Sequence, residues 1–539
     1  MSRTTPAWLE KAVFYEIYPQ SFYDSNGDGI GDLPGVIEKL DYVRELGCTG
    51  IWLNPFFVSP FRDAGYDVAD YCAVDPRYGT NDDAKRLFDE AHARGIRVLI
   101  DLVPGHTSID HPWFQAAASA EATPYDDYYV WTESVWQKPP EGYKWLTGYG
   151  DRDGSALLNF FWAQPALNYG FGVPDPNEPW QQPIDAPGPK AVREEMRRVM
   201  AFWLEMGCDG FRVDMAESLI KGPNKHAAGI KLWQELRSWL EELHPEAVLQ
   251  AEWGKPSDAI EAGFHMDFLL HFGDAAYTAL FRKDNGFSHY LDPEGASYFA
   301  RSGRGNLMSF LSRYLTFAEA TRGRGFINIP SGNHDIAPRL ALGRSIEDLR
   351  IVFAFLLTMP GVPFIYYGDE IGMNGYPGLP SKEGGYIRTQ VRTPMRWTDG
   401  PKAGFSSAAP DEFYLPVDPE PADANVGVQA ERPDSLLSFV KQLIRLRTEN
   451  DAFAASSELT PLYFNADSPL FAYELTNKGK RALVVLNPSN RGVRGTIDLS
   501  DVFAPIPEPV HSQGTISIDE GGNIELGPVS FAIFVEVQA

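Results

Sequence analysis

Residues 210–214 read Gly-Phe-Arg-Val-Asp and combine an apolar strand pattern with one cation and one anion. Arg212 and Asp214 are two positions apart, so on an extended strand their side chains point to the same side. A neighbouring arginine favours the ionised form of a carboxyl, and an ionised carboxylate fixed at a strand end is a candidate nucleophile. A structural ion pair would show the same pattern, so other parts of the chain must decide between the two.

Further ionisable side chains stand at or just after the ends of other predicted strands: Asp101, His106, Glu252, His334 and Asp335. In a parallel barrel the C-terminal ends of the strands meet at one face, which is where such barrels carry their catalytic groups. Burying so many ionisable groups together is costly unless they serve a purpose. The set therefore favours a catalytic site over a structural ion pair.

The chemistry that these groups suggest is glycoside cleavage. Asp214, held ionised by Arg212, can attack an anomeric carbon. Glu252 lies in the apolar run 247–253, and an apolar flank raises the pKa of a carboxyl, so Glu252 can stay protonated as the general acid. A separation of about 5 to 5.5 Å between the two carboxyls would give a retaining reaction through a covalent glycosyl-enzyme. Three further side chains can hold sugar hydroxyls in the transition state: His106, His334 and Asp335.

Eight β-branched and aromatic runs alternate with segments of helical periodicity, as in the helix expected over 36–46. The predicted strands span 12–22, 49–57, 96–103, 209–214, 247–253, 266–272, 326–330 and 362–367. Alternating strands and helices indicate an α/β fold with a parallel sheet. Eight such units predict a TIM (β/α)8 barrel.

Two long stretches depart from this rhythm. Residues 107–189 are rich in Trp, Tyr, Pro and Gly and are too long for an ordinary loop, so we expect an inserted subdomain after the third strand. The barrel would then comprise residues 1–106 and 190–455. Short strands with turn residues between them follow from residue 456 and predict a C-terminal antiparallel β-sandwich domain over 456–539.

A polar loop follows the first predicted strand. Its oxygen donors alternate as in the first nine positions of an EF-hand loop: Asp24, Asn26, Asp28, Ile30 (through its carbonyl) and Asp32. The glutamate expected at the twelfth position is missing, because Gly35 stands there. A plain polar turn is the alternative. The pattern favours a structural calcium ion, and we expect no organic cofactor.

Composition limits the partners. The formal net charge of −26 repels phosphate backbones, which excludes nucleic acid and favours a small neutral sugar. Aromatic residues make up 13% of the chain and suit the C–H faces of sugars. The 3 cysteines show no metal spacing and suggest a reducing compartment. No apolar run has the length of a signal peptide or membrane span, so we expect a cytoplasmic protein, monomeric or a small homo-oligomer.

The motifs around these residues resemble the α-amylase superfamily, glycoside hydrolase family 13. The matching stretches are 101–106 (DLVPGH), 164–168 (QPALN), 210–214, Glu252 and 333–335 (NHD). By this resemblance Asp214 is the nucleophile, Glu252 the acid/base and Asp335 the stabiliser of the transition state. The resemblance adds Tyr66 and Asp67 to the subsite for the cleaved sugar, beside His106, Arg212 and His334.

Within the superfamily the chain is most similar to the oligo-1,6-glucosidase, α-glucosidase and trehalose-synthase group. The markers are 24–32, 65–71, 359–363, 392–397 (RTPMRW) and 403–406. In that group an aspartate such as Asp67 pairs with an arginine after the NHD motif, here Arg339, to close the pocket. Gly105 in place of the usual Asn argues against an amylase-type calcium site near the inserted subdomain. Met215 after the nucleophile is bulkier than usual and can alter linkage preference.

We therefore predict a retaining, exo-acting α-glucosidase that cleaves short α-linked glucosides from the non-reducing end. A trehalose-synthase-like isomerase or α-glucosyltransferase would use the same covalent intermediate. A non-catalytic partner protein with this fold is a remote alternative, because the resemblance implies that such proteins lose the carboxylates that are present here as Asp214, Glu252 and Asp335.

Overall fold

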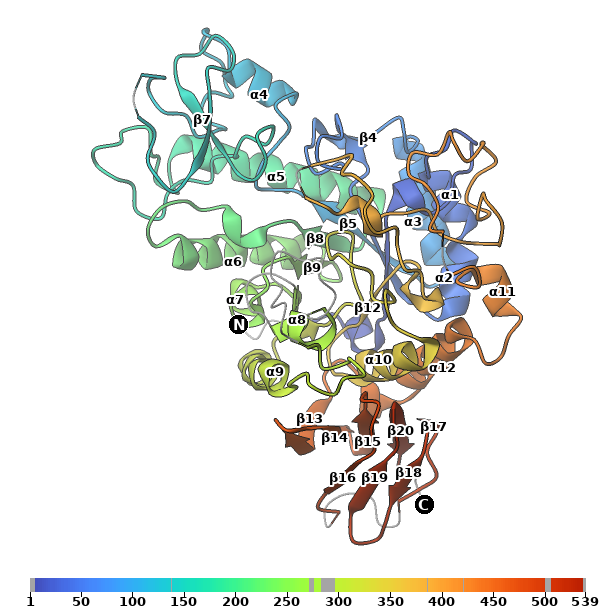
Figure 1. Cartoon of the computed structure of the whole chain (residues 1–539). Helices are drawn as coiled ribbons and strands as arrows, with labels where there is room; N and C mark the ends of the chain where they lie inside the picture. The colour runs from blue at the N-terminus through green and yellow to red at the C-terminus, as the bar shows by residue number, and fades with distance from the viewer. Residues whose placement is uncertain are drawn as a thin grey trace.

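The computed structural model describes residues 5–136, 138–270, 276–282, 296–384, 386–419, 421–499 and 506–536. Its centre is a sheet of eight parallel strands in the order β11-β10-β9-β8-β5-β2-β1-β12 (Figure 1). An isolated parallel bridge between Pro330 and Phe364 joins the two ends, so the sheet closes nearly into a ring. The predicted TIM barrel is confirmed. The strands are β1 Phe14–Ile17, β2 Gly50–Leu53, β5 Arg97–Leu102, β8 Gly210–Val213, β9 Val248–Ala251, β10 Met266–Phe268, β11 Phe326–Asn328 and β12 Phe364–Tyr366.

Each strand is shorter than its predicted apolar run. The run 12–22 holds only β1, because Pro19, which has no N–H to donate to a sheet, begins a 3-10 turn over Pro19–Ser21. The run 266–272 holds only β10, and its last two residues lie outside the described part of the chain. The helix predicted over 36–46 is two helices that meet at Lys39. Apolar runs thus located the strands but overestimated their lengths.

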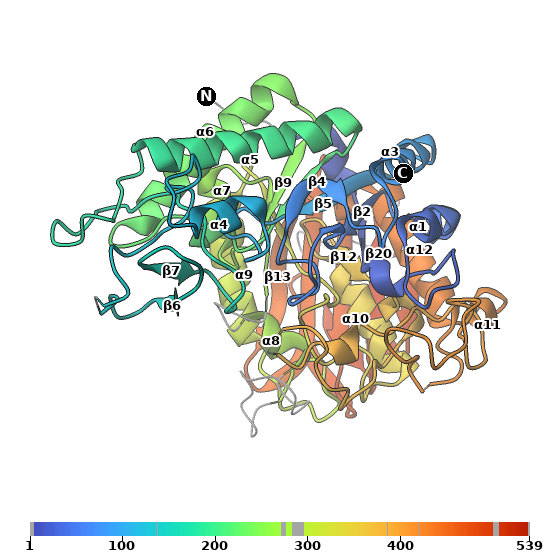
Figure 2. The ribbon, with the colours of Figure 1, turned by 90° about the horizontal axis from the view of Figure 1, so that it is seen from above.

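Helices surround the strands, as the view from above shows (Figure 2). They are α1 Leu33–Glu38, α2 Leu40–Leu46, α3 Asn81–Ala93, α5 Pro187–Met206, α6 Lys225–Leu243, α7 Pro256–Ala262, α8 Ala276–Phe281, α9 Met308–Thr321, α10 Ile346–Thr358, α11 Val426–Ala430 and α12 Leu436–Glu449. Among the described residues, none of these helices combines the length and apolar character that a membrane crossing requires.

The segment between β5 and α5 projects from the barrel beside α5 and α6 (Figures 1 and 2). It contains α4 Pro112–Ala117 and a hairpin of β6 Lys144–Thr147 and β7 Ser155–Leu158. It has its own small apolar cluster of Val130, Leu157, Ala166 and Phe171. A bridge between His106 and Ala166 attaches it to the end of β5. A second short hairpin, β3 Phe57–Val58 with β4 Asp70–Val74, follows β2.

The last part of the chain forms two antiparallel sheets below the barrel (Figure 1). One sheet contains β13 Glu458–Asn465, β14 Ser468–Asn477, β15 Lys480–Asn487, β17 His511–Gln513 and β20 Ser530–Val535. The other contains β16 Val493–Thr496, β18 Ile516–Ile518 and β19 Asn523–Leu526. The predicted antiparallel C-terminal domain is confirmed. Its strand β14 shares the main apolar core through Phe471 and Tyr473.

Candidate active site

Arg212 joins three carboxyl groups at the C-terminal ends of the strands. It lies on β8, directly beside Asp101 of β5 in the parallel register. Its Nη1 donates to Asp101 Oδ1 at 2.7 Å and to Asp214 Oδ1 at 3.0 Å, and its Nη2 lies 2.7 Å from Glu252 Oε1. The guanidinium side chain is only 1% exposed. One buried cation therefore holds the predicted nucleophile and the predicted acid together.

The protonation of Asp214 differs from the prediction. Arg212 favours its ionised form, but burial and the adjacent Glu252 carboxylate raise the pKa of Asp214 well above its usual value. The opposing effects have a simple cause, because two buried carboxyl groups in hydrogen-bonding contact resist carrying two negative charges. The prediction that Arg212 holds Asp214 ionised considered only one of these effects and left out burial and Glu252.

Glu252 lacks the predicted apolar flank at its carboxyl oxygens. Oε1 pairs with Arg212, and Oε2 accepts a hydrogen bond of 2.9 Å from the backbone N–H of Met215. The apolar residues of β9 are packed in the barrel core instead. Met215 has a left-handed backbone with φ of 43°, which is uncommon outside glycine and turns its N–H toward Glu252. The turn after the predicted nucleophile thus positions the predicted acid.

Asp335 is held by two arginines that were not predicted as site residues. Its Oδ1 accepts from Arg388 Nη1 and from Arg392 Nη2, each at 2.9 Å. Its side chain is 22% exposed, more than that of Asp214 or Glu252. Arg392 belongs to the RTPMRW stretch, which served only as a family marker. Two cations on one carboxylate therefore fix the position of Asp335.

His334 and Tyr66 line the base of the site. Their rings stack at 5.3 Å, and the Tyr66 hydroxyl lies 2.8 Å from His334 Nε2 and 3.2 Å from Asp101 Oδ2. His334 Nδ1 lies 2.9 Å from Oε1 of the fully buried Glu16 on β1. Burial lowers the pKa of His334 well below its usual value, so its imidazole is neutral. The structure therefore brings both predicted residues to the site and adds Glu16.

His106 occupies the opposite side, where β5 leads into the inserted segment. Its Nε2 lies 3.1 Å from the Tyr66 carbonyl, and Asn159 Nδ2 lies 3.2 Å from its Nδ1. Burial lowers the pKa of His106 to about 4. Lys221 Nζ donates to Asn159 Oδ1 at 2.9 Å. A Cβ at Gly105 would meet Asn159 Nδ2 at 2.7 Å, so the glycine makes room for this contact.

Asp67 and Arg339 do not form the predicted pair. The carboxylate of Asp67 accepts from the backbone N–H groups of Arg62 and Asp63, each at 3.0 Å, and from Ser59, so it stabilises its own loop. Arg339 is buried behind the site and donates to the Tyr367 carbonyl at 2.6 Å. Its guanidinium lies over the rings of Tyr366 and Tyr367. The predicted pairing of Asp67 with Arg339 is therefore wrong, and the assignment of either residue to the sugar subsite stays a prediction.

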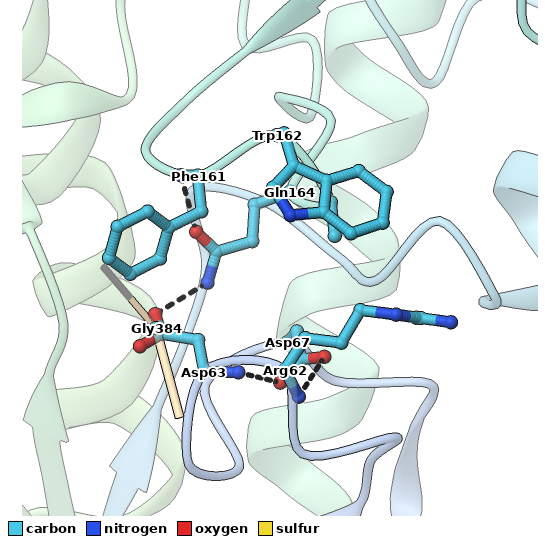
Figure 3. A pocket seen from close by; sticks show the side chains of 8 residues that line it. Arg62, Asp63, Asp67, Phe161, Trp162, Gln164 and Gly384 are labelled. Carbon is cyan, nitrogen blue, oxygen red and sulfur yellow. Dashed lines mark hydrogen bonds between the residues drawn. The ribbon is translucent and has the colours of Figure 1, made fainter. Parts of the chain in front are cut away.

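A different aspartate and arginine make the ion pair beside the site. Arg388 Nη2 donates to Asp63 Oδ1 at 2.6 Å while its Nη1 holds Asp335. Asp63 Oδ2 accepts from Gln164 Nε2 at 2.8 Å. Asp63 and Gln164 line a cavity of about 230 Å³, in which Asp63 faces Gln164 while Asp67 turns toward the backbone of its loop (Figure 3). Three distant segments of the chain are thus joined at Asp63.

This ion pair gives a testable expectation. Asp63→Asn should lower both the melting temperature and kcat/KM, because it leaves the Arg388 guanidinium, whose side chain is 8% exposed, with Asp335 as its remaining ion-pair partner. Breaking a buried pair costs about 3–5 kcal/mol of stability when one partner is deleted; the isosteric amide should cost less. The matched control is Asp110→Asn, which breaks the exposed pair with Arg62 and should change stability by about 1 kcal/mol or less. Equal melting temperatures for the two variants would contradict the assignment.

The loop 24–32 is built from short side-chain-to-backbone turns. Asp24 Oδ1 accepts from the N–H groups of Asn26 and Gly27, Asn26 Oδ1 from that of Asp28, and Asp28 Oδ1 from that of Ile30. Asp32 binds Ser25 and begins α1 by accepting from Gly35. An all-oxygen donor set suits calcium, yet within the described ranges no three His, Cys, Asp or Glu side chains are grouped to hold a metal ion. Calcium at this loop stays a prediction.

Chelation tests it directly. If calcium binds the folded chain, EDTA should lower the melting temperature, because a ligand present at 100 times its Kd stabilises by about 2.7 kcal/mol. Asp28→Ala, at an exposed loop position, should remove the response to EDTA and to added calcium. A melting temperature that EDTA does not change, with no calcium in the purified protein by metal analysis, would show that the loop is a plain polar turn.

The chain is similar to known proteins over most of its length. The alpha-amylase catalytic-domain family matches residues 16–456. Trehalose synthase from Pimelobacter sp. (strain R48) is 34% identical over 496 residues, covering 83% of this chain and 81% of that protein. Oligo-1,6-glucosidase from Parageobacillus thermoglucosidasius is 31% identical over 543 residues, covering 90% and 91%.

A solved structure agrees over almost the whole chain. The trehalulose synthase MutB from Pseudomonas mesoacidophila MX-45 superposes with a TM-score of 0.79 at 26% sequence identity, covering 99% of this chain and 100% of that one. The match of the catalytic-domain family extends from β1 to the end of the barrel. The chain therefore belongs to the alpha-amylase family, glycoside hydrolase family 13, and is an enzyme of that family.

Proposed function

We propose that this enzyme is a retaining, exo-acting α-glucosidase that acts on short α-linked glucosides. The observation that carries the proposal is the shared Arg212 guanidinium, which holds Asp214 and Glu252 in contact. Inverting glycosidases separate their carboxyl groups by about 6.5–9.5 Å to admit a water molecule, whereas retaining enzymes keep them about 5–5.5 Å apart. Contact between the carboxyls supports the retaining arrangement.

In the proposed reaction Asp214 attacks the anomeric carbon while Glu252 protonates the departing glycosidic oxygen. The proton of Glu252 passes to that oxygen as Asp214 forms its bond to carbon, which leaves Glu252 ionised. Glu252 then takes a proton from water, which cleaves the glucosyl ester and regenerates Asp214. Asp335 and the neutral His334 are placed to hold hydroxyls of the same sugar ring.

Exo action is supported by the enclosure of the site. Asp214 and Glu252 are 10% and 7% exposed at their side chains, and the Asp63–Arg388 pair lies against Asp335. An ion pair in this position blocks a sugar chain from continuing past the site, so there is room for the end of an oligosaccharide rather than its middle. A small neutral sugar suits such a pocket, because its hydroxyls can bind the surrounding carboxylates and arginines.

Transfer of the glucosyl group is a second candidate. The same intermediate can pass to a sugar hydroxyl instead of water, which would make the enzyme a trehalose-synthase-like isomerase or an α-glucosyltransferase. Relatives named trehalose synthase and the structural likeness to trehalulose synthase favour this reading as much as the oligo-1,6-glucosidase relative favours hydrolysis.

Product analysis on maltose, isomaltose, sucrose, trehalose and kojibiose tests both candidates. Glucose as the sole product from maltose means hydrolysis, and trehalose from maltose means isomerisation. NMR of the first-formed product should show the α-anomer, because two inversions retain configuration. A β-anomer would refute the retaining mechanism, and inertness on every α-glucoside would revive a non-catalytic role for this fold.

A further inference from the structure

Residues 159–164 of the inserted segment cross from one side of the site to the other. At the start, Asn159 Nδ2 lies 3.2 Å from His106 Nδ1 and 3.8 Å from Met215 Sδ, next to the nucleophile. At the end, Gln164 donates to Asp63 at 2.8 Å and accepts from the Phe161 N–H at 2.7 Å. Both ends of this strap (residues 159–164) are therefore attached to walls of the pocket.

The middle of the strap meets a ring from the segment after β12. Tyr386 lies 5.8 Å from Phe160 and 5.7 Å from Phe161 between ring centroids, and the two phenylalanine rings are 4.3 Å apart. The Arg388 guanidinium lies 5.8 Å from the Phe161 ring and 5.9 Å from the Tyr386 ring. The cation that binds Asp335 thus also lies next to the rings that join the two segments.

The exposed fraction of the side chain falls from Tyr386 to the carboxylates. Tyr386 is 40% exposed, whereas the side chains of Asp335, Asp214 and Glu252 are 22%, 10% and 7% exposed. Tyr386 is therefore the most exposed of these groups. Its contacts with Phe160 and Phe161, together with the contact of Arg388 with the Phe161 ring, join the strap to the segment 386–392. Aromatic rings pack well on the C–H faces of sugars and exclude water.

We propose that Tyr386 and Phe161 are specificity-determining residues whose ring contact roofs the pocket and sets how the glucosyl-enzyme divides between water and a sugar hydroxyl. The inference rests on the proposed covalent intermediate. In either outcome the bond from the anomeric carbon to Asp214 breaks, a bond to the acceptor oxygen forms, and the acceptor's proton passes to Glu252. The roof keeps the sugar acceptor next to the intermediate and limits the entry of water.

The test measures how the glucosyl-enzyme divides between hydrolysis and transfer to a sugar. The substrate is p-nitrophenyl α-glucoside, which serves as donor and, at high concentration, as acceptor. Released nitrophenol reports formation of the intermediate, and chromatography gives the ratio of transfer product to glucose. Tyr386→Ala should still release nitrophenol but lower this ratio by about three- to tenfold, the change expected from loss of an aromatic contact. Phe161→Leu, which removes the ring but keeps bulk, should lower it in the same direction.

Two control variants show whether a change in the ratio comes from loss of the contact between Tyr386 and Phe161 or from a general effect of the substitution. Tyr386→Phe keeps the ring and should keep the ratio. Trp136→Ala removes a ring that is 92% exposed on the same inserted segment and should change nothing. The inference is overturned if Tyr386→Ala and Phe161→Leu both leave the ratio unchanged, if Trp136→Ala lowers it equally, or if the native enzyme releases nitrophenol without any transfer product. Absence of nitrophenol release by the native enzyme would instead refute the proposed function and the inference with it.

Discussion

Replacing Asp214 by alanine should reduce kcat on p-nitrophenyl α-glucoside by about 10³-fold or more, as expected when the nucleophile of a covalent mechanism is removed. The good leaving group makes the first step depend on attack rather than on acid assistance, so the loss reports directly on Asp214. Full activity in this variant would show that the catalytic assignment is wrong. Asp214→Asn, which keeps the shape of the side chain, should be similarly inactive.

The stability of these variants separates catalysis from folding. Arg212 loses one of its three partners but keeps Asp101 and Glu252, so it is not left buried without a counter-charge. Removing one of two carboxyls in contact also removes their mutual repulsion. We therefore expect the melting temperature of Asp214→Asn to equal or exceed that of the native enzyme, and a marked fall would point to a structural role.

The pH profile of the native enzyme provides an independent check. Asp214 must be ionised to attack, and burial together with Glu252 raises its pKa well above the usual value. Activity should therefore be lost as pH falls through that raised pKa, at a higher pH than an ordinary aspartate would give.

The sequence predicts the barrel well because its signals are local. β-Branched and aromatic runs that alternate with segments of helical periodicity identify all eight strands, and residues such as Asp101, Arg212 and Glu252 then converge because strand ends converge. Glu16 could have been found in the same way. It is a lone carboxylate inside the first run, and its burial at the barrel axis follows from the strand alone.

The sequence does not predict how the loops pair. Asp63 and Asp67 stand four residues apart in one loop whose backbone is left-handed at Phe61, Ala64 and Gly65, so no alternation rule says which carboxylate faces the pocket. Arg388 lies in a stretch without periodicity, and its approach to Asp335 depends on the course of the whole segment. The raised pKa of Asp214 was not predicted for the same reason, because it depends on burial and on neighbouring charges rather than on residue type.

Replacing Arg212 by leucine should have the largest combined effect on stability and activity. The change leaves Asp101 and the pair of Asp214 and Glu252 near one another with no bridging cation. Deleting one partner of a buried ion pair costs about 3–5 kcal/mol, so we expect the free energy of unfolding, from urea titration, to fall by that order. Loss of the cation raises the pKa of Asp214 further, which moves the acidic limb of any residual activity to higher pH.

The source of this cost can be isolated with a second substitution. If Arg212→Leu is destabilising because it leaves carboxylates uncompensated, then adding Asp101→Asn should recover part of the lost stability, since it removes a buried negative charge. If the cost came from lost packing of the guanidinium against Trp52 and Tyr66, the second change would destabilise further. Arg212→Lys distinguishes charge from geometry: a single ammonium can neutralise the site but cannot reproduce the fork that holds Asp214 and Glu252 together, so stability should recover more than kcat.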